Sequence, residues 1–509
     1  MTTLSFFHTF QNDSAEITQW DICADGAIIL SGENIKSLIE ALQGIKGTVF
    51  CYDLSRCAPF LHWYCVENKI EYEVFEMKST YYTFRLKKCE LKGATNFFDF
   101  EEPKTPQELE RKLIMRFATL KSYISEAGAP YTLKSIDKKC TIGGIAWSCF
   151  KEMSKFEAFC PKIYGKQYNL LLPYYRGGFV YAKPGEYRNV CEIDNNGLYT
   201  HVYKNYPMPF GKPVFCNKID DLEKFDFKLY HITAEFKLKS GFIPIIAQRN
   251  RVLTIDTEYI KSGRMSLFVT QYDLELIAQF YDIEFEFING YGFRTIEGKF
   301  NEFADFWASK KKNDELKSTI KFMLNIPSGK AAARGIYENK EYKIVDGILT
   351  HEIKEIQQNA GGYEYIPLAI AITSIARYIL ISTAQKIGFD RIAYMDTDSI
   401  KFTGDFPEWI KPDPLRLGAW KIEQKSQILK FIVKKFYIHY SDLGALKAVI
   451  SGVTDEAIKE YGYNAILSQR AAYSFIRDFN EEKTIVQKIK TPCKGGLHDV
   501  YFERRLSGL

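Results

Sequence analysis

Two aspartates separated by one residue, Asp396 and Asp398, lie between the apolar runs 391–393 and 400–402. This pattern predicts a strand, a tight turn and a second strand. Because residues two apart project to the same side of an extended chain, we expect the two carboxylates to converge. They would repel each other unless a cation lay between them, and hard oxygen ligands suit Mg²⁺ or Mn²⁺. The pair predicts a metal site, although two such residues can also merely cap a β-turn.

A third carboxylate and a basic helical face would complete a reaction centre. Asp194 follows the apolar run 190–193 and enters a loop, where a metal ligand is expected. Lys317 and Lys321 are four residues apart in a predicted helix at 303–324, so both ammonium groups share one helical face, next to the lysines at 310–312. Carboxylates that hold metals, opposite lysines that hold a triphosphate, are what a nucleotidyl transferase needs.

The composition is that of a globular protein with several domains. A chain of 509 residues, 46% hydrophobic and 26% charged, has room for roughly two to four domains with proper cores. The 68 basic and 63 acidic residues nearly cancel, so the net charge of +5 is weak evidence for a polyanionic partner. Local clusters of basic residues say more, but a charge run is usually a solvated face and counts only with a motif beside it. Besides 310–312, these residues are Lys421, Lys425, Lys430, Lys434 and Lys435.

Cysteine usage and hydropathy indicate a cytoplasmic protein. The eleven cysteines contain no C-x-x-C pair, which favours reduced thiols, and residues 1–10 lack the features of a signal peptide. The most apolar run, 366–376, is interrupted by Arg377 before it could span a bilayer. We expect a buried helix here, with Pro367 in its first turn and Gly388 near its end. The expected protein is a monomer with no membrane partner.

Local patterns divide the chain into α/β and strand-rich parts. The last part, from about residue 456, is expected to consist of short basic elements. Upstream of it, in chain order, the expected elements are strands at 47–52 and 81–85, a helix at 106–125, a loop at 174–179, a strand-rich region at 230–298 with one helix at 273–281, and a hairpin at 342–356 around Asp346-Gly347.

Several segments resemble the ordered motifs of family B DNA polymerases. Residues 194–199 resemble motif A, residues 321–329 motif B, and residues 394–399 motif C. The chain is most similar to the protein-primed branch of small tailed phages and linear plasmids. Three further segments carry that similarity: the Y-x-G-G loop at 175–178, the T-x-x-D-L run at 270–274, and the K-x-Y run at 435–437.

The resemblance implies an α/β multidomain fold, in which an RNase H-like exonuclease-type domain precedes a right-hand polymerase with two insertions. The implied boundaries are 1–154 for the exonuclease-like domain, 155–206 for the palm with motif A, 207–298 for an insertion that docks a terminal protein, 299–333 for the fingers with motif B, 334–365 for a second insertion hairpin, 366–455 for the palm with motif C, and 456–509 for the thumb.

The resemblance also implies a role for individual residues. The catalytic residues, which would bind two Mg²⁺ ions that Mn²⁺ can replace, are Asp194 and Asp398 as direct ligands and Asp396 as support. The nucleotide-binding residues are Lys321, Lys317, Asn325 and Tyr199, the last as a steric gate against the ribose 2′-hydroxyl. The DNA-binding residues are Tyr175, Arg176, Gly177, Gly178, Lys435 and Tyr437.

Motif B departs from the family pattern. The family favours N-S-x-Y-G, whereas this chain has Asn325-Ile326-Pro327-Ser328-Gly329. Ser328 cannot supply the aromatic packing against the nascent base pair. We expect Pro327 to end the helix just before it.

The N-terminal region departs further from the family. The opening strand at 4–9 has no acidic residue, and Cys57 and Met115 stand where metal-binding aspartates belong. Residues 99–101 imitate the first acidic motif, but they follow the second one and read as an acidic loop. We therefore expect an exonuclease fold that lacks 3′–5′ exonuclease activity.

The sequence thus favours a template-directed DNA-dependent DNA polymerase that lacks proofreading, with protein-primed replication of a phage or linear mobile element. The implied partners are DNA template and primer, dNTPs and a terminal protein, in the cytoplasm of a bacterial host. Two alternatives stay open: a template-independent or terminal-protein nucleotidyl transferase, and a non-catalytic DNA-binding relative of the polymerases.

Overall fold

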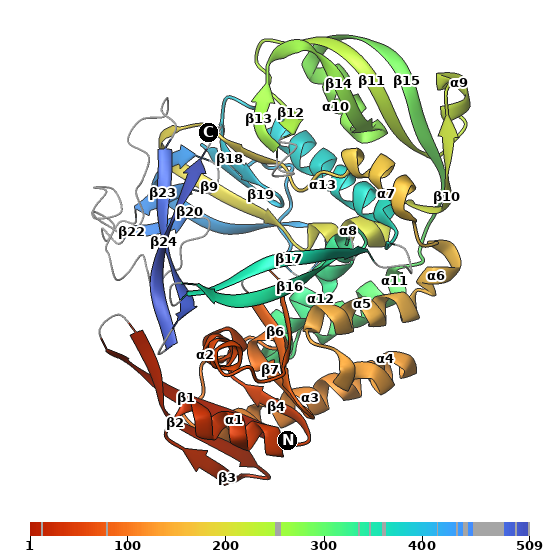
Figure 1. Cartoon of the computed structure of the whole chain (residues 1–509). Coiled ribbons are helices and arrows are strands. Elements are labelled where there is room, and N and C mark those ends of the chain that lie inside the picture. The colour runs from red at the N-terminus through yellow and green to blue at the C-terminus, as the bar shows by residue number, and fades with distance from the viewer. Residues whose placement is uncertain are drawn as a thin grey trace.

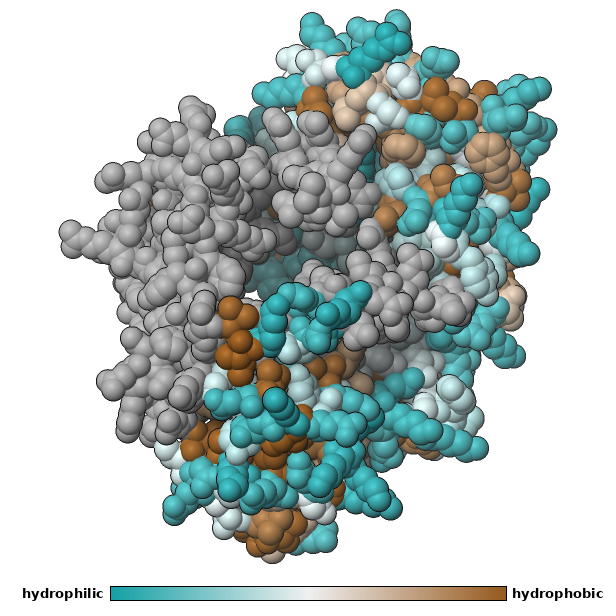
Figure 2. Space-filling view, viewed as in Figure 1, coloured by the Kyte–Doolittle hydropathy of each residue, from teal (hydrophilic) through white to brown (hydrophobic). Residues whose placement is uncertain are grey.

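The N-terminal part and a strand-rich insertion lie at opposite ends of the molecule, and a central part with the long helices lies between them (Figure 1). Figure 2 shows a hollow lined by hydrophilic residues between the N-terminal part and the insertion. The computed structural model describes residues 1–11, 14–77, 80–249, 256–333, 336–345, 348–358, 363–414, 416–433, 436–440, 446–450, 483–493 and 496–506.

The N-terminal part is built on a mixed sheet with the described strand order β3-β2-β1-β4-β7-β6-β5. Strands β1, β4 and β7 run parallel, and the other neighbours are antiparallel. The predicted strands at 47–52 and 81–85 are confirmed as β4 and β6. The bounds are β1 Thr2–Gln11, β2 Ser14–Ala24, β3 Ala27–Gly32, α1 Ile35–Gly44, β4 Gly47–Cys51, α2 Leu54–Glu67, β5 Glu73–Met77, β6 Thr80–Leu86 and β7 Cys89–Gly93.

A helical segment joins this sheet to the rest of the molecule. The predicted helix at 106–125 is confirmed as α3, which begins at Pro106 after the capping side chain of Thr105. Phe150 of α5 stacks on Phe300, and one core extends from these helices to Trp307. The core therefore crosses the expected boundary at residue 154. The bounds are α3 Pro106–Glu126, α4 Pro130–Ser135, α5 Ile142–Met153, α6 Phe156–Phe159 and α7 Gly165–Leu171.

The central sheet carries both aspartate segments and has the described order β22-β21-β20-β9-β19-β18-β8. All of its described pairings are antiparallel. Helix α8, Leu198–Asn205, follows β9 directly. The bounds of the strands are β8 Val180–Ala182, β9 Gly185–Asn195, β18 Ile392–Asp396, β19 Ser399–Thr403, β20 Trp420–Val433, β21 Phe436–Tyr440 and β22 Leu446–Ile450.

Helix α13, Ile366–Ile387, is the buried helix expected after residue 366, with Pro367 in its first turn and Gly388 as its C-cap. Within the described residues it is long and apolar enough to cross a membrane, and 83% of its apolar window is buried inside the structure, as in a core helix. Arg377 interrupts the apolar run but not the helix, which continues to Gly388 as predicted. Its guanidinium is neutralised by Asp273 and bonded to backbone carbonyls, so burial is tolerated.

The insertion forms a separate antiparallel sheet with the order β10-β15-β11-β14 and one helix, α10, against it. This confirms the strand-rich region with one helix near 273–281. A capping box between Thr270 and Asp273 begins α10. The bounds are β10 Met208–Cys216, α9 Ile219–Leu222, β11 Phe227–Leu238, β12 Ile246–Arg249, β13 Asp256–Ile260, β14 Ser262–Thr270, α10 Gln271–Phe280 and β15 Tyr281–Ile296.

The single helix expected at 303–324 is wrong. The chain forms α11, Asn301–Lys310, and α12, Lys317–Lys330, with a break between them. The cause is Asn313, whose Oδ1 accepts the backbone N–H of Glu315 at 3.0 Å and whose amide donates to the Tyr123 hydroxyl at 3.0 Å. Asparagine side chains that bond to the backbone in this way compete with helix formation.

The expected helix end before Pro327 is also wrong, because α12 continues to Lys330. A proline weakens the backbone bonds of the preceding turn. Here Thr200 Oγ1 and Tyr203 Oη of α8 donate to the Leu324 carbonyl at 3.2 and 3.0 Å, and Ser328 Oγ donates to the Asn325 carbonyl at 2.7 Å. These side-chain bonds hold the turn next to Pro327 in its helical position.

The predicted hairpin at 342–356 is confirmed as β16, Ile336–Val345, and β17, Ile348–Gln358, although its tip, Asp346-Gly347, lies outside the described residues. The short elements expected near the C-terminus are wrong for the described part of that region. Strands β23, Lys483–Cys493, and β24, Gly496–Leu506, form an 11-residue hairpin ladder, and they continue the sheet as β16-β17-β23-β24.

Candidate active site

The turn between β18 and β19 holds Asp396 and Asp398. Thr397 adopts a left-handed conformation with φ 58°, and the Asp398 N–H donates to the Asp396 carbonyl at 2.6 Å. The expected alternation of extended residues is therefore wrong at this point, because the residue between the aspartates is not extended. Asp396 Oδ2 accepts from Tyr394 Oη at 3.0 Å, and Oδ1 accepts from Thr397 Oγ1 at 3.0 Å. These bonds fix Asp396 within the turn.

Strand pairing brings Asp194 to the same turn. Strand β19 pairs with β9, and in that register Ser399 lies opposite Asp194. The N–H of Asn195 donates to the Asp398 carbonyl at 2.7 Å, which ties the end of β9 to the turn. Asp194 and Asp398 thus converge at one end of the central sheet, although 204 positions separate them in the sequence.

The charges of these carboxylates affect one another. Burial and, to a lesser degree, the negative charges of Asp194 and Asp396 together raise the pKa of Asp398 to about 6, against the opposing effect of Lys321. Burial also raises the pKa of Asp194, which the charges of Lys421 and Lys321 oppose. A cluster of partly buried carboxylates with raised pKa values is a common property of sites that bind cations or protons.

Lysines from two other parts of the chain face this cluster. Lys317 and Lys321 of α12 are exposed, and Lys321 is near enough to affect the pKa of both Asp194 and Asp398. Burial lowers the pKa of Lys311, and so do the nearby charges of Lys321, Lys421 and Lys317. The structure therefore gathers positive groups beside the carboxylates, an arrangement suited to a polyanion.

Tyr199 lies in the first turn of α8, just after Asp194. Gly197, with φ 64°, turns the chain from β9 into this helix. Burial raises the pKa of Tyr199 to about 12, and the neighbouring Tyr175 contributes to the rise. Asp398 and Asp396 contribute more weakly, so the Tyr199 hydroxyl is near enough to Tyr175 and to both carboxylates to be affected by their charges.

The loop at 175–178 packs directly on the aspartate turn. A Cβ atom on Gly178 would lie 2.5 Å from Thr397 Oγ1, so only glycine fits there. The Thr397 N–H donates to the Phe179 carbonyl at 2.9 Å. Any shift of this loop would therefore be transmitted to the turn.

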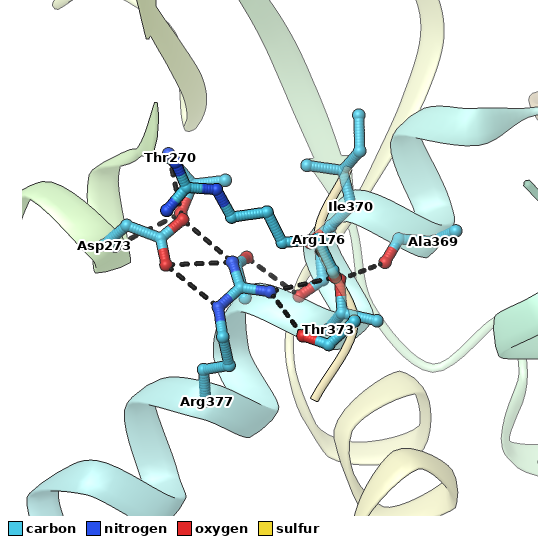
Figure 3. Close-up of polar contacts among 10 residues, drawn as sticks. Arg176, Thr270, Asp273, Ala369, Ile370, Thr373 and Arg377 are labelled. Carbon is cyan, nitrogen blue, oxygen red and sulfur yellow. Dashed lines mark hydrogen bonds and ion pairs between the residues drawn. The ribbon is translucent and has the colours of Figure 1, made fainter. Parts of the chain in front are cut away.

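A buried ion pair holds the loop from the other side (Figure 3). Arg377 of α13 donates to both carboxylate oxygens of Asp273, at 2.8 and 2.9 Å from Nη2, and to the carbonyls of Arg176 and Gly177, each at 3.0 Å from Nη1. Burial opposes ionisation of Asp273, but the Arg377 and Arg176 charges hold its pKa below the usual value. This network links the insertion, through Asp273, to the loop.

The donor set fits a hard divalent cation. Among the residues that the structure describes, no three His, Cys, Asp or Glu side chains are spaced to hold a metal ion by themselves. Magnesium is usually held by one or two carboxylates, and waters and substrate phosphates complete its shell. Asp194 and Asp398 are two adjacent carboxylates of that kind, beside lysines that can hold the phosphates.

Some expected residues are not brought into the site. Lys435 lies outside the described residues, and Tyr437 is described only as part of the backbone of β21. Asn325 is exposed on α12, one helical turn after Lys321. Sequence reasoning gave no role to Arg377 or Lys421. For Arg377, the available signal in the sequence was a lone arginine in an apolar helix. For Lys421, a role could be found only once the strand register was known.

The expected exonuclease positions carry no acidic cluster in the described N-terminal residues. Cys57 is fully buried in α2, and burial raises the pKa of its thiol to about 12, so it is neutral near pH 7. Met115 is exposed on α3. Asp53 accepts the backbone N–H of Ser55 at 2.9 Å as the N-cap of α2. Residues 99–101 form a loop, as predicted.

Related sequences agree with this geometry. A family model described as DNA polymerase type B, organellar and viral, matches residues 120–406. The DNA polymerase of Bacillus phage Nf is 33% identical over 318 residues, which cover 59% of this chain and 55% of that protein. The DNA polymerase of Bacillus phage phi29 is 35% identical over 279 residues, or 52% of this chain and 48% of that protein. The chain spans about half the length of these relatives.

Solved structures show a similar fold along the whole chain. Phi29 DNA polymerase complexed with primer-template DNA and incoming nucleotide substrates matches with a TM-score of 0.80 at 22% identity, over 99% of both chains. The same polymerase with single-stranded DNA gives 0.79 at 22% identity. This likeness confirms the expected α/β multidomain class, with an exonuclease-type domain before a right-hand polymerase. With the family model covering more than half of its length, the chain belongs to the organellar and viral type B DNA polymerases.

Proposed function

We propose that the protein is a template-directed, Mg²⁺-dependent DNA polymerase. The observation that carries this proposal is the meeting of Asp194 and Asp398 at one end of the central sheet, opposite the lysines of α12. The named relatives are DNA polymerases, which supports the same activity here.

The residues of the site have complementary tasks in such a reaction. Asp194 and Asp398 would hold two Mg²⁺ ions, which stabilise charge on the attacking and leaving oxygens when bound. Lys321 and Lys317 would bind the triphosphate as point charges. Tyr199 would occupy the space of a ribose 2′-hydroxyl and so select deoxynucleotides.

The loop at 175–178 would hold the template beside the reacting atoms. Lys435 and Tyr437 would hold the primer strand. In the reaction, the primer 3′-oxygen loses its proton to solvent and forms a bond to the α-phosphorus. The bond from that phosphorus to the pyrophosphate then breaks. Positioning dominates such phosphoryl transfers. The fixed geometry of the turn at Asp396 would therefore contribute to the rate as much as the charge of the Asp396 carboxylate.

Primer extension with purified protein tests the proposal. We expect incorporation of templated dNTPs with Mg²⁺ or Mn²⁺. Asp398→Ala should keep its fold by circular dichroism and lose activity about a hundredfold to a thousandfold or more, since removal of one group that stabilises transition-state charge costs about that much. Absence of incorporation by the wild-type protein with either metal would sink the proposal. Products that ignore the template would instead favour the template-independent transferase.

We also propose that the N-terminal domain lacks 3′–5′ exonuclease activity. A neutral, buried thiol at Cys57 and a thioether at Met115 are poor ligands for Mg²⁺, which prefers oxygen. A primer with a mismatched 3′ end should therefore stay intact with Mg²⁺ in the Asp398→Ala variant, where synthesis is removed. Shortening of that primer would contradict the proposal.

Protein priming is the third part of the proposal. The insertion sheet at 207–298 corresponds in position to the region expected to dock a terminal protein, and Asp273 connects it to the loop at 175–178. Incubation with labelled dNTP, template and candidate terminal proteins should label a hydroxyl side chain of one of them. The candidates must include the cognate terminal protein of the replicon. If the protein extends DNA primers but labels none of these candidates, it uses DNA priming alone.

A further inference from the structure

Lys421 holds a place in the site that sequence patterns did not assign to it. In β20 it lies opposite Asp194 of β9, and its Nζ is 3.3 Å from Asp194 Oδ1. The same ammonium group forms an ion pair with Glu423. About a quarter of the Lys421 side chain is exposed, so a small ligand can reach it.

A second lysine of the central sheet shows what a purely structural ion pair looks like here. Lys401 of β19 pairs with Glu192 of β9, and its side chain is only 2% exposed. No ligand can reach that ammonium group. Lys421 differs because about a quarter of its side chain is exposed.

The positive neighbours of Lys421 are the second observation. Lys321 and Lys421 are the two charges that most lower the pKa of Lys311 after burial, and Lys317 follows. Lys321, Lys317 and Lys421 thus lie near enough to Lys311, at the end of α11, to affect its charge. Like charges that the fold brings together repel one another, and an anion with several charges relieves that repulsion.

We propose that Lys421 is a further nucleotide-binding residue, whose ammonium group binds the phosphates that leave as pyrophosphate. The inference rests on the polymerase activity proposed above. Before the nucleotide binds, Lys421 neutralises Asp194. When the nucleotide enters, Lys421 leaves the Asp194 carboxylate and binds phosphate oxygens instead. It then acts from the sheet together with the lysines of the fingers.

The proposal predicts a specific kinetic pattern for Lys421→Met, which keeps the length of the side chain and removes its charge. In DNA-primed incorporation we expect the KM for dNTP and the inhibition constant of pyrophosphate to rise about tenfold, equal to about 1.4 kcal/mol. The kcat at saturating dNTP should change less than threefold. Lys421→Arg should restore most of both affinities, since it keeps the charge. Lys411→Met, on an exposed loop, removes the same charge and serves as the control.

Equilibrium binding separates this role from a structural one. With a primer that ends in a dideoxynucleotide and with Ca²⁺ in place of Mg²⁺, dNTP should bind about tenfold more weakly to Lys421→Met than to Lys411→Met. If Lys421→Met instead changes only the metal concentration for half-maximal activity, the ammonium group merely neutralises Asp194 and the proposal is wrong. Unchanged dNTP and pyrophosphate affinities also overturn it.

A measurement on the wild-type protein covers the case in which Lys421→Met fails to fold. Acetylation of Lys421 by a water-soluble reagent, followed by mass spectrometry, should slow when dNTP or pyrophosphate is added, while acetylation of Lys411 should not. Equal rates at Lys421 with and without these ligands would refute the proposal. A wild-type protein that incorporates no nucleotide fails the proposed function instead, so the two failures are distinct.

Discussion

Replacing Asp398 by Asn should make the protein more stable while it abolishes catalysis. Burial and the charges of Asp194 and Asp396 raise the pKa of Asp398 from its usual 3.8 to about 6. A tenfold change in proton affinity corresponds to about 1.4 kcal/mol, so ionisation of this carboxyl costs the folded protein about 3 kcal/mol at neutral pH. The amide of Asn has a similar size and no charge, and therefore avoids this cost.

The sign of the effect fixes its pH dependence. A group whose pKa is raised by folding binds its proton more tightly in the folded state, so the folded state loses stability as pH rises from about 4 to 6. The stability gain of Asp398→Asn should be complete above pH 6 and should vanish below about pH 4, where Asp398 is protonated in both states. At pH 7.5 the gain corresponds to roughly 6 °C in melting temperature for a cooperative unit of about 250 residues.

Thermal unfolding by circular dichroism between pH 4 and pH 7.5, without metal, measures the effect. Asp282→Asn, an exposed aspartate on β15, is the matched control and should leave the melting temperature within about 1 °C. Added Mg²⁺ should stabilise the wild-type protein and narrow the gap, because binding to the folded state shifts unfolding. A variant that melts at or below the wild-type temperature at pH 7.5, or whose gain grows toward pH 4, would refute the electrostatic reasoning.

Three further substitutions test the geometry of the site. Tyr199→Ala should increase ribonucleotide incorporation at least tenfold relative to dNTP in primer extension, and an unchanged ratio would argue against the gate. Gly178→Ala should lower kcat about a hundredfold with little change in melting temperature, because its Cβ would collide with Thr397 and displace the turn. Arg377→Met should lower the free energy of unfolding by about 3 to 5 kcal/mol, since it leaves Asp273 buried without its partner. Chemical denaturation measures this loss. Recovery of the free energy of unfolding in the double variant with Asp273→Leu would confirm the cause.

Features encoded within a few residues could be predicted from the sequence. The strand, turn and strand around Asp396, the strand ending at Asp194 and the hairpin near residue 346 depend on local alternation and turn chemistry. The roles of the aspartates could be predicted only because several motifs occur in the expected order. A single motif would not have been enough to predict them. The error at Thr397 arose because alternation was carried one residue too far into the turn.

Features that depend on distant partners could not be predicted. Pro327 was expected to end its helix because the hydroxyls that satisfy the Leu324 carbonyl come from α8, 124 and 121 residues away. The ion pair of Arg377 could not be predicted because its partner Asp273 lies 104 residues upstream. Lys421 looked like a solvated residue until the pairing of β20 with β9 placed it beside Asp194. A single sequence contains no record of these pairings.

The N-terminal part has a structural task that does not depend on metal-binding carboxylates. Its helices support the segment that carries the lysines: Lys310 pairs with Glu126, and Asn313 donates to the Tyr123 hydroxyl. Helix α5 approaches α12 so closely that a Cβ atom on Gly143 would lie 3.2 Å from Ile326 Cδ1. Because these contacts set the position of α12, and α12 carries Lys321, we expect the region to be needed for nucleotide binding even without the exonuclease activity that we propose it lacks.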